Sequence, residues 1–188
     1  MPELLDIPEV RARVSRLSVD EYHRLDEFNE NHRRTELIRG IVIEKMSKSP
    51  LHSAVAKRLY DLIARSLPQG LVARREDPLT LKDSEPEPDV AVVSGSEADF
   101  FKQHPQTAEL VFEVAVRSVA LDRENASLYA EAGIKEYCVV LAQQQQLEVY
   151  CRVDKGRYLD KKILVAQEVF QSLAVPSVRF RVDELFRA

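Results

Sequence analysis

The chain has 188 residues, which is enough for one sizeable hydrophobic core and short for two. Its residues are 45% apolar and 31% charged, as in ordinary globular domains and unlike disordered or fibrous chains. The net charge of −4 excludes a protein that attracts nucleic acid over its whole surface. Any nucleic-acid contact therefore requires a local basic patch.

The cellular setting is predicted from the cysteines and the first residues. Cys138 and Cys151 lie within apolar runs, and the chain opens without the basic-then-apolar pattern of a secretory leader. No stretch approaches the roughly 18 consecutive apolar residues that a membrane span needs. We expect free thiols that serve packing, a cytoplasmic location and no insertion into a membrane.

The first part of the chain predicts an arm followed by a domain. Residues 1–17 have no clear period and predict an irregular or weakly helical arm, and the domain is expected to span 18–188. Ser18 begins a segment with capping-box spacing that predicts a short helix to about Phe28. Residues 36–44 favour strands on either side of Gly40, as an antiparallel pair or one bent strand.

The central part predicts a long helix and buried strands. Ser49 and Pro50 have the character of an N-cap and a first helical residue, and an apolar stripe continues to just before Pro68. Strands are expected at residues 70–75 and 78–81. A polar turn then leads into a buried strand at residues 89–93.

The last part of the chain alternates further strands with a helix. A buried strand at residues 110–116 precedes a helix from about Asp122 to Ala132, which Gly133 ends. The remaining expected elements are a strand at 137–141, a hairpin loop at residues 142–145, short strands near 157–165 and 168–173, and a helical turn at 182–186. If the loop centres on Gln144 and Gln145, Cys138 lies opposite Cys151.

Two acidic residues in the buried strands are the candidates for chemistry. Glu113 is the one charged residue in the apolar run 110–116, so its carboxylate needs a partner. Asp89 begins the other strand, and hard oxygen ligands on rigid neighbouring strands suit Mg²⁺. Two carboxylates about 5 Å apart repel by roughly 3 kcal/mol at an effective dielectric near 20, and a cation relieves this repulsion. Alternatively, Asp89 only ends a turn while Glu113 pairs with an arginine or lysine.

A family resemblance favours the metal interpretation. Glu36-Leu37-Ile38-x-Gly40, His52, Pro88-Asp89-Val90 and Glu113-Val114 resemble motifs of the Uma-two family, bacterial proteins that are predicted restriction endonucleases. The most specific segment is Tyr129-Ala130-x-Ala132-Gly133-Ile134-x-Glu136-Tyr137. The similarity covers about residues 18–187.

The resemblance implies an α/β fold with a restriction-endonuclease-like core of the PD-(D/E)XK kind, a mixed β-sheet flanked by helices. It implies that Asp89 and Glu113 bind Mg²⁺ or Mn²⁺ and that the protein hydrolyses phosphodiester bonds in DNA. Small domains of this kind commonly work as homodimers, so a homodimer is expected.

The chain departs from the superfamily pattern at the basic residue. A lysine usually follows the glutamate by two residues, where this chain has Ala115, and many family members place a lysine on the next helix, where it has Asn125. Asn125 can hydrogen-bond a catalytic water but carries no charge. A replacement would have to come from Arg117, Arg123 or Lys135. A catalytically degenerate module that binds nucleic acid or a protein is therefore the competing hypothesis.

Other candidates remain open. Glu36 is predicted to join the acidic cluster or to be a solvated strand-end residue, and His52 is either catalytic or a surface or capping residue. Tyr129 and Tyr137 are interpreted as core aromatics that support the fold. A third hypothesis is an interaction protein without a metal, in which an arginine holds Glu113.

Overall fold

The computed structural model describes residues 6–26 and 33–187. The chain divides into two compact units: one comprises the residues up to Lys45 together with Lys82–Glu85, and the other comprises Met46–Leu81 and the residues from Pro86 onward. Among the described residues, no helix has the length and apolar character needed to cross a membrane.

The first unit contains two short helices and a hairpin. These are α1 (Pro8–Arg11), α2 (Val19–Asp26), β1 (Thr35–Ile38) and β2 (Ile41–Glu44). The Ser18 N–H donates a 2.8 Å hydrogen bond to the Glu21 carboxylate, and the Glu21 N–H donates one of 3.3 Å to the Ser18 hydroxyl. The capping box is confirmed, while the predicted helix end at Phe28 lies outside the described residues. β1 and β2 are antiparallel, so the paired alternative for residues 36–44 is correct.

The turn of this hairpin depends on Gly40. Its φ is +75°, and a Cβ there would lie 2.6 Å from the Cβ of Arg16. Glycine adopts this left-handed conformation without steric cost, which explains the residue at this position. The segment 82–85 lies along β1, where the Glu85 N–H donates a 2.7 Å hydrogen bond to the Leu37 carbonyl.

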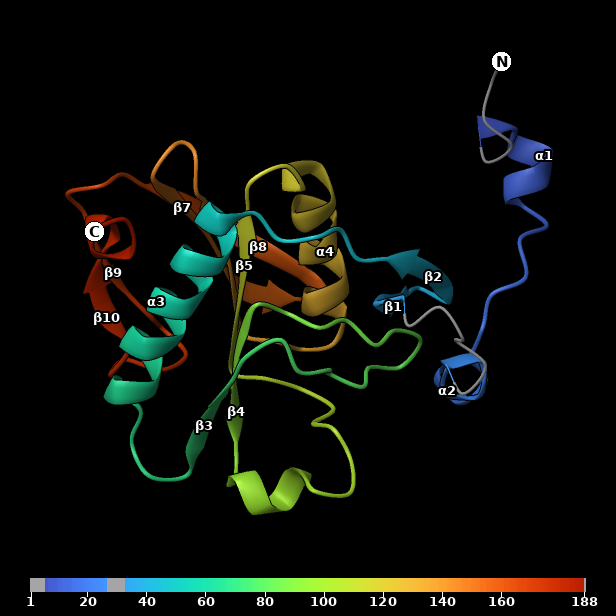
Figure 1. Ribbon diagram of the computed structural model, residues 1–188, viewed down its shortest axis with the longest axis horizontal. Helices are drawn as coiled ribbons and strands as arrows, with labels where there is room; N and C mark the ends of the chain where they lie inside the picture. Colours follow the sequence, from blue (N-terminus) through green and yellow to red (C-terminus); the bar gives the residue numbers. More distant parts are fainter. Residues whose placement is uncertain (1–5, 27–32, 188) are drawn as a thin grey trace. The chain divides into compact units, whose positions relative to one another are not determined.

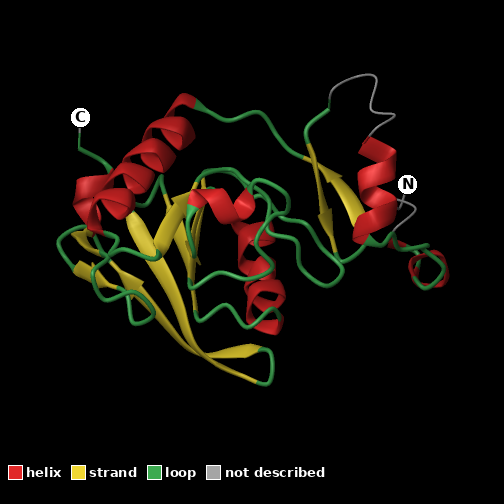
Figure 2. Cartoon of the chain, turned by 90° about the horizontal axis from the view of Figure 1, so that it is seen from below, coloured by secondary structure: helices red, strands yellow, loops and turns green. Residues whose placement is uncertain are grey.

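The second unit is built on a six-stranded mixed sheet with the order β3-β4-β5-β6-β7-β8 (Figures 1 and 2). The strands are β3 (Leu71–Arg74), β4 (Val90–Ser94), β5 (Leu110–Ala115), β6 (Glu136–Leu141), β7 (Gln146–Asp154) and β8 (Arg157–Leu164). β5 and β6 are parallel, joined by a helical crossover, and the other neighbours are antiparallel. The predicted α/β architecture with a mixed sheet is confirmed.

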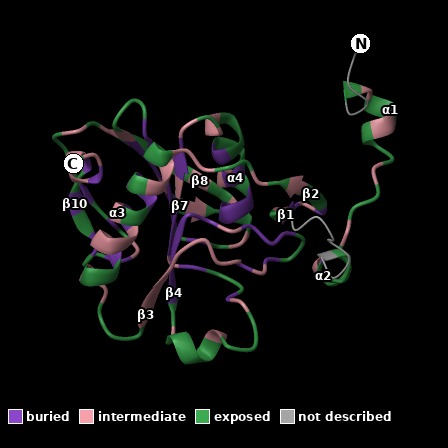
Figure 3. Ribbon diagram, in the orientation of Figure 1, coloured by how far each residue is buried: buried purple, intermediate pink, exposed green. Residues whose placement is uncertain are grey.

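Helix α3 (Pro50–Ser66) packs on this sheet. The Ser49 side chain accepts a 3.2 Å hydrogen bond from the His52 N–H, and Pro50 occupies the first turn, as the sequence predicts. The apolar stripe of the helix joins a core with alternate residues of the sheet: Val55, Ala56, Leu59, Ile63, Val90, Val92, Phe112, Val114, Cys138 and Val140. In Figure 3 the central strands are accordingly buried along their length.

Helix α4 (Val119–Glu131) packs against the sheet side chains that alternate with those facing α3, such as Tyr137 next to Cys138. The rings of Tyr129 on α4 and Tyr137 on β6 lie 4.9 Å apart, and the Tyr137 hydroxyl donates a 2.7 Å hydrogen bond to the Asp122 carbonyl. Both tyrosines are fully buried. The prediction that both are core aromatics is confirmed.

The remaining elements are short. β9 (Val169–Gln171) and β10 (Arg179–Arg181) form an antiparallel pair, and the 3₁₀ helices η2 and η3 span Glu97–Phe100 and Val182–Leu185. The strand predicted at residues 78–81 is wrong. This segment is a loop that buries Leu79 and Leu81, and the Leu79 N–H bonds the carbonyl of Pro86, within the following loop.

The predicted pairing of the two cysteines is also wrong. Cys138 lies opposite Val149, and Cys151 lies opposite Glu136. Leu141 pairs with Gln146, so the hairpin centres between Gln143 and Gln144, one residue earlier than predicted. Moving the centre of an antiparallel hairpin by one residue moves each partner by two. Both cysteine side chains are buried.

Candidate active site

Asp89 lies directly before β4, opposite Glu113 on the neighbouring strand β5. Val90 on β4 pairs with Phe112 on β5, so the next position of the antiparallel register sets Asp89 opposite Glu113. The Asp89 N–H donates a 3.2 Å hydrogen bond to Oε2 of Glu113, and the Val114 N–H donates one of 2.8 Å to Oδ2 of Asp89. Each carboxylate is therefore fixed by the backbone of the opposite strand.

The N-terminal end of α3 brings two basic side chains to Asp89. Nε2 of His52 lies 3.1 Å from Oδ2 of Asp89, and Nζ of Lys48 lies 3.5 Å from Oδ1. Burial by itself would raise the pKa of Asp89, but hydrogen bonds from His52 and the Val114 N–H and the charge of Lys48 outweigh it and lower the pKa. Asp89 is consequently held as a carboxylate although it is buried.

Glu113 is held from the opposite side by α4. The Tyr129 hydroxyl donates a 3.0 Å hydrogen bond to Oε1 of Glu113. Asn125 is buried on the same helix, one turn before Tyr129, and residues four apart share a helix face. Four elements therefore contribute to this site: α3, β4, β5 and α4.

Comparison with known proteins places this chain in a family. The family model Uma2, described as "Putative restriction endonuclease", matches residues 19–183. The chain belongs to the Uma2 family. No curated protein sequence matches this chain.

The crystal structure of an Anabaena variabilis protein, described as "a putative nuclease belonging to DUF820", has a similar fold. It superposes with a TM-score of 0.75 and 18% sequence identity, covering 90% of this chain and 97% of the other. This Uma2 chain therefore shares the fold of that protein. The division into an arm at residues 1–17 and a domain at 18–188 stays a prediction.

Two of the three basic residues predicted as replacements for the missing lysine of this Uma2 protein bind other carboxylates. Arg123 binds the Glu148 carboxylate, and Lys135 binds that of Glu109. Arg117 is exposed beyond the end of β5. The basic residue beside Asp89 is Lys48, which lies in an irregular segment without sequence periodicity.

Glu36, the other predicted acidic residue, belongs to the first unit. It lies on β1, and its Oε2 is 3.7 Å from Nζ of Lys45, also in that unit. Its participation in an acidic cluster with Asp89 stays a prediction.

The carboxylates of Asp89 and Glu113 are the candidate metal ligands at this site. Among the described residues, no group of three or more His, Cys, Asp and Glu side chains is arranged as a metal site. Mg²⁺ nevertheless commonly uses one or two carboxylates and completes its shell with water and substrate phosphate oxygens. The carboxylates of Glu113, on β5, and of Asp89, directly before β4, fit that ligand set.

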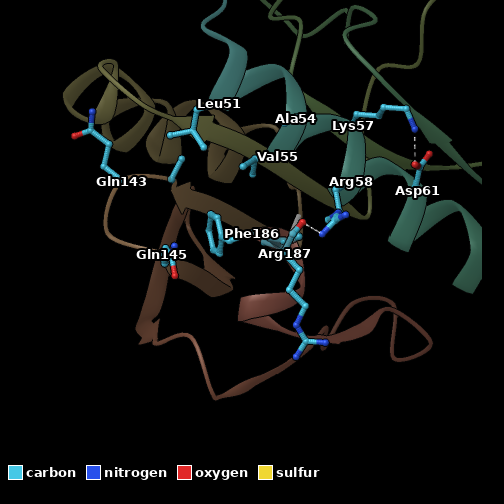
Figure 4. A pocket seen from close by; sticks show the side chains of 12 residues that line it. Leu51, Ala54, Val55, Lys57, Arg58, Asp61, Gln143, Gln145, Phe186 and Arg187 are labelled. Carbon is cyan, nitrogen blue, oxygen red and sulfur yellow. Dashed lines mark hydrogen bonds and ion pairs between the residues drawn. The ribbon is translucent and has the colours of Figure 1, made fainter.

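A separate pocket of about 660 Å³ lies along α3 (Figure 4). Its lining includes Leu51 and Val55 of α3 and Phe186 of the C-terminal segment. Arg58, another lining residue, donates hydrogen bonds to the backbone carbonyls of Glu184 and Arg187, so its guanidinium is engaged within the protein. Asp89 and Glu113 are not among the described residues that line this pocket.

Proposed function

We propose that this Uma2 protein is a nuclease that hydrolyses phosphodiester bonds in DNA with the help of Mg²⁺ or Mn²⁺. The observation that carries the proposal is the pair Asp89 and Glu113, set opposite each other and anchored by backbone N–H groups. In this proposal the two carboxylates hold the metal. When bound, such a metal lowers the pKa of a water molecule and stabilises charge on the phosphate.

The neighbouring side chains are assigned supporting roles. His52 orients Asp89 through Oδ2, and Tyr129 orients Glu113 through Oε1. Carboxylate ligands that are hydrogen-bonded by surrounding groups keep their geometry when substrate binds. Asn125 is proposed to hydrogen-bond the attacking water.

Metal binding and cleavage should be measured on the same proteins. We expect Mn²⁺ titration calorimetry to give at least tenfold weaker binding for Asp89→Asn and Glu113→Gln than for the wild type. The matched control is Glu109→Gln, which removes a carboxylate just before β5 that binds Lys135 and Ser94. Plasmid DNA should be cut in Mg²⁺ and remain intact in EDTA. Equal Mn²⁺ binding by the wild type and Asp89→Asn would contradict the proposal.

A second candidate is a catalytically degenerate module that binds nucleic acid or a protein. Ala115 and Asn125, which replace the lysines usual in such enzymes, favour it, as does the net charge of −4. Specific Mn²⁺ binding without cleavage of any DNA would support this candidate. Loss of the Mn²⁺ signal in Glu113→Gln would rule out an interaction protein without a metal.

We also propose a homodimer, to be tested by light scattering of the purified protein.

A further inference from the structure

Lys48 is held between two carboxylates at the candidate active site. It lies just before Ser49, the N-cap of α3, and its side chain is 20% exposed. Its Nζ is 2.7 Å from Oε2 of Glu76 and 3.5 Å from Oδ1 of Asp89. The ammonium group therefore stands next to the oxygen of Asp89 that does not accept the bonds from His52 and Val114.

Glu76 has the features of an anchor for this lysine. It follows β3 with a φ of +56°, a left-handed conformation that few residues other than glycine adopt. Its N–H donates a 3.1 Å hydrogen bond to the Pro88 carbonyl, directly before Asp89 in the sequence. Arg75 Nη2 lies 3.1 Å from its other carboxylate oxygen. The backbone hydrogen bond to Pro88 thus connects Glu76 to the segment that carries Asp89, directly before β4.

Phosphodiester hydrolysis is favoured by a positive charge close to the reacting phosphate. The reaction forms a P–O bond to water and breaks the P–O bond to the leaving sugar oxygen. That oxygen takes up one proton of the water, and the other is released to solvent. Negative charge builds up on the phosphate oxygens during the exchange, and a fixed ammonium group nearby stabilises it. Lysine has three N–H donors, so it can bond Glu76 and still reach a phosphate.

We propose that Lys48 is the basic residue of this site and supplies the positive charge that Ala115 and Asn125 lack. Glu76 is its positioning residue. The inference rests on the proposed nuclease function, because it assigns to Lys48 a phosphate bound at Asp89 and Glu113. It explains how the chain retains a cation at the site although both usual lysine positions are changed.

Three variants test the role of Lys48. Lys48→Gln removes the charge at similar size, Lys48→Arg keeps the charge, and Lys57→Gln is the matched control. Lys57 is 65% exposed on α3 and pairs with Asp61. Affinity for a short DNA duplex is measured by fluorescence anisotropy in Ca²⁺ at fixed salt, where cleavage is not supported. Cleavage in Mg²⁺ and Mn²⁺ titration calorimetry follow on the same samples, with urea denaturation as the check of folding.

We expect Lys48→Gln to bind the duplex at least fivefold more weakly than Lys57→Gln does and to cut at least a hundredfold more slowly. Its Mn²⁺ affinity should be unchanged or higher, because a competing positive charge near Asp89 has been removed. Lys48→Arg should recover most of the duplex affinity. Glu76→Gln should lower the cleavage rate while the protein stays folded.

The outcomes separate this inference from the proposed function. If the wild type cuts DNA and Lys48→Gln cuts and binds as Lys57→Gln does, the role of Lys48 is refuted and the nuclease function stands. If the wild type binds no Mn²⁺ and cuts no DNA, the proposed function fails and the inference fails with it. Loss of Mn²⁺ binding in Lys48→Gln would also overturn it, because the lysine would then be structural.

Discussion

The hydroxyl of Tyr129 donates a 3.0 Å hydrogen bond to Oε1 of Glu113, which connects the most specific family segment to the candidate metal ligand. The sequence predicts this tyrosine as a core aromatic, and its ring is indeed fully buried. The same residue thus packs α4 against the sheet and orients a carboxylate. The family motif that contains Tyr129 therefore supplies a hydrogen bond to one of the two proposed metal ligands.

The first prediction concerns this contact. Tyr129→Phe removes the hydroxyl and leaves the ring packing intact, so Glu113 loses one of the bonds that orient it. We expect Mn²⁺ affinity to fall about tenfold, as for other groups that orient metal ligands, and stability to fall by about 1 kcal/mol. Calorimetry and urea denaturation measure the two effects. In Tyr158→Phe, which removes a hydrogen bond to the Ile134 carbonyl, stability should fall with unchanged Mn²⁺ affinity.

The second prediction concerns the pH dependence of stability. Glu148 on β7 has a fully buried side chain that contacts Arg123, Tyr150 and Lys161. Burial raises the pKa of Glu148, but its hydrogen bonds with Arg123, Tyr150 and Lys161 outweigh this and lower the pKa from 4.5 to about 2. The lowered pKa means that Glu148 contributes stability above about pH 4.5, which is lost as the pH falls toward 2.

The size of this effect follows from the pKa difference. A shift of this size corresponds to at most about 3 kcal/mol, and both cations are partly exposed, so we expect about 1–3 kcal/mol. Urea denaturation of the wild type and Glu148→Gln at pH 7 and pH 3 measures it. The stability difference between the two proteins should be largest at pH 7 and shrink at pH 3. A difference that does not change with pH would refute this account of Glu148.

Parts of the site could be predicted from the sequence because their signal is local. Asp89 and Glu113 stand out as acidic residues in apolar runs, and buried strands must lie in a sheet. His52 came from the family resemblance. Lys48 and Glu76 lie in irregular segments with no periodicity, and their ion pair depends on the path of the chain after β3 and before α3. Local sequence patterns do not predict such a contact.

The wrong predictions about the fold also have causes in the local sequence. The glutamines 143–146 are four equivalent residues with no Gly or Asn to mark the turn, so the sequence did not fix the strand register at Cys138. Leu79 and Leu81 alternate with polar residues as in a strand, yet the loop buries them without pairing. β10 has three residues, too few for a periodic pattern to be recognised.

The third prediction concerns the aromatic cluster in the second unit. The ring of Phe170 on β9 lies 5.6 Å from that of Phe112 and 5.2 Å from that of Phe180. Phe170→Ala leaves a cavity between these rings and should cost about 3–5 kcal/mol of the free energy of unfolding. Phe101→Ala, at a side chain that is 84% exposed, should change it by less than about 0.5 kcal/mol. Similar losses for both variants would mean that the short β9–β10 pair does not complete the core.

The fourth prediction concerns the turn of the first unit. Gly40→Ala places a methyl group 2.6 Å from the Cβ of Arg16 at a φ of +75°, whereas Gly70→Ala, at a φ of +89°, meets no atom within 4 Å. Both variants bear the cost of a left-handed alanine, about 1 kcal/mol, and Gly40→Ala adds the steric overlap.

Hydrogen exchange gives a local readout of this difference. The Leu17 N–H bonds the Gly40 carbonyl, and the Glu85 N–H bonds the Leu37 carbonyl, so both report on the hairpin. In Gly40→Ala these two amides should exchange at least fivefold faster, and in Gly70→Ala they should be unchanged, because Gly70 belongs to the other unit. Unchanged exchange in Gly40→Ala would mean that the segment around Arg16 moves aside without loosening the hairpin. The close approach at Gly40 would then have no part in holding the first unit together.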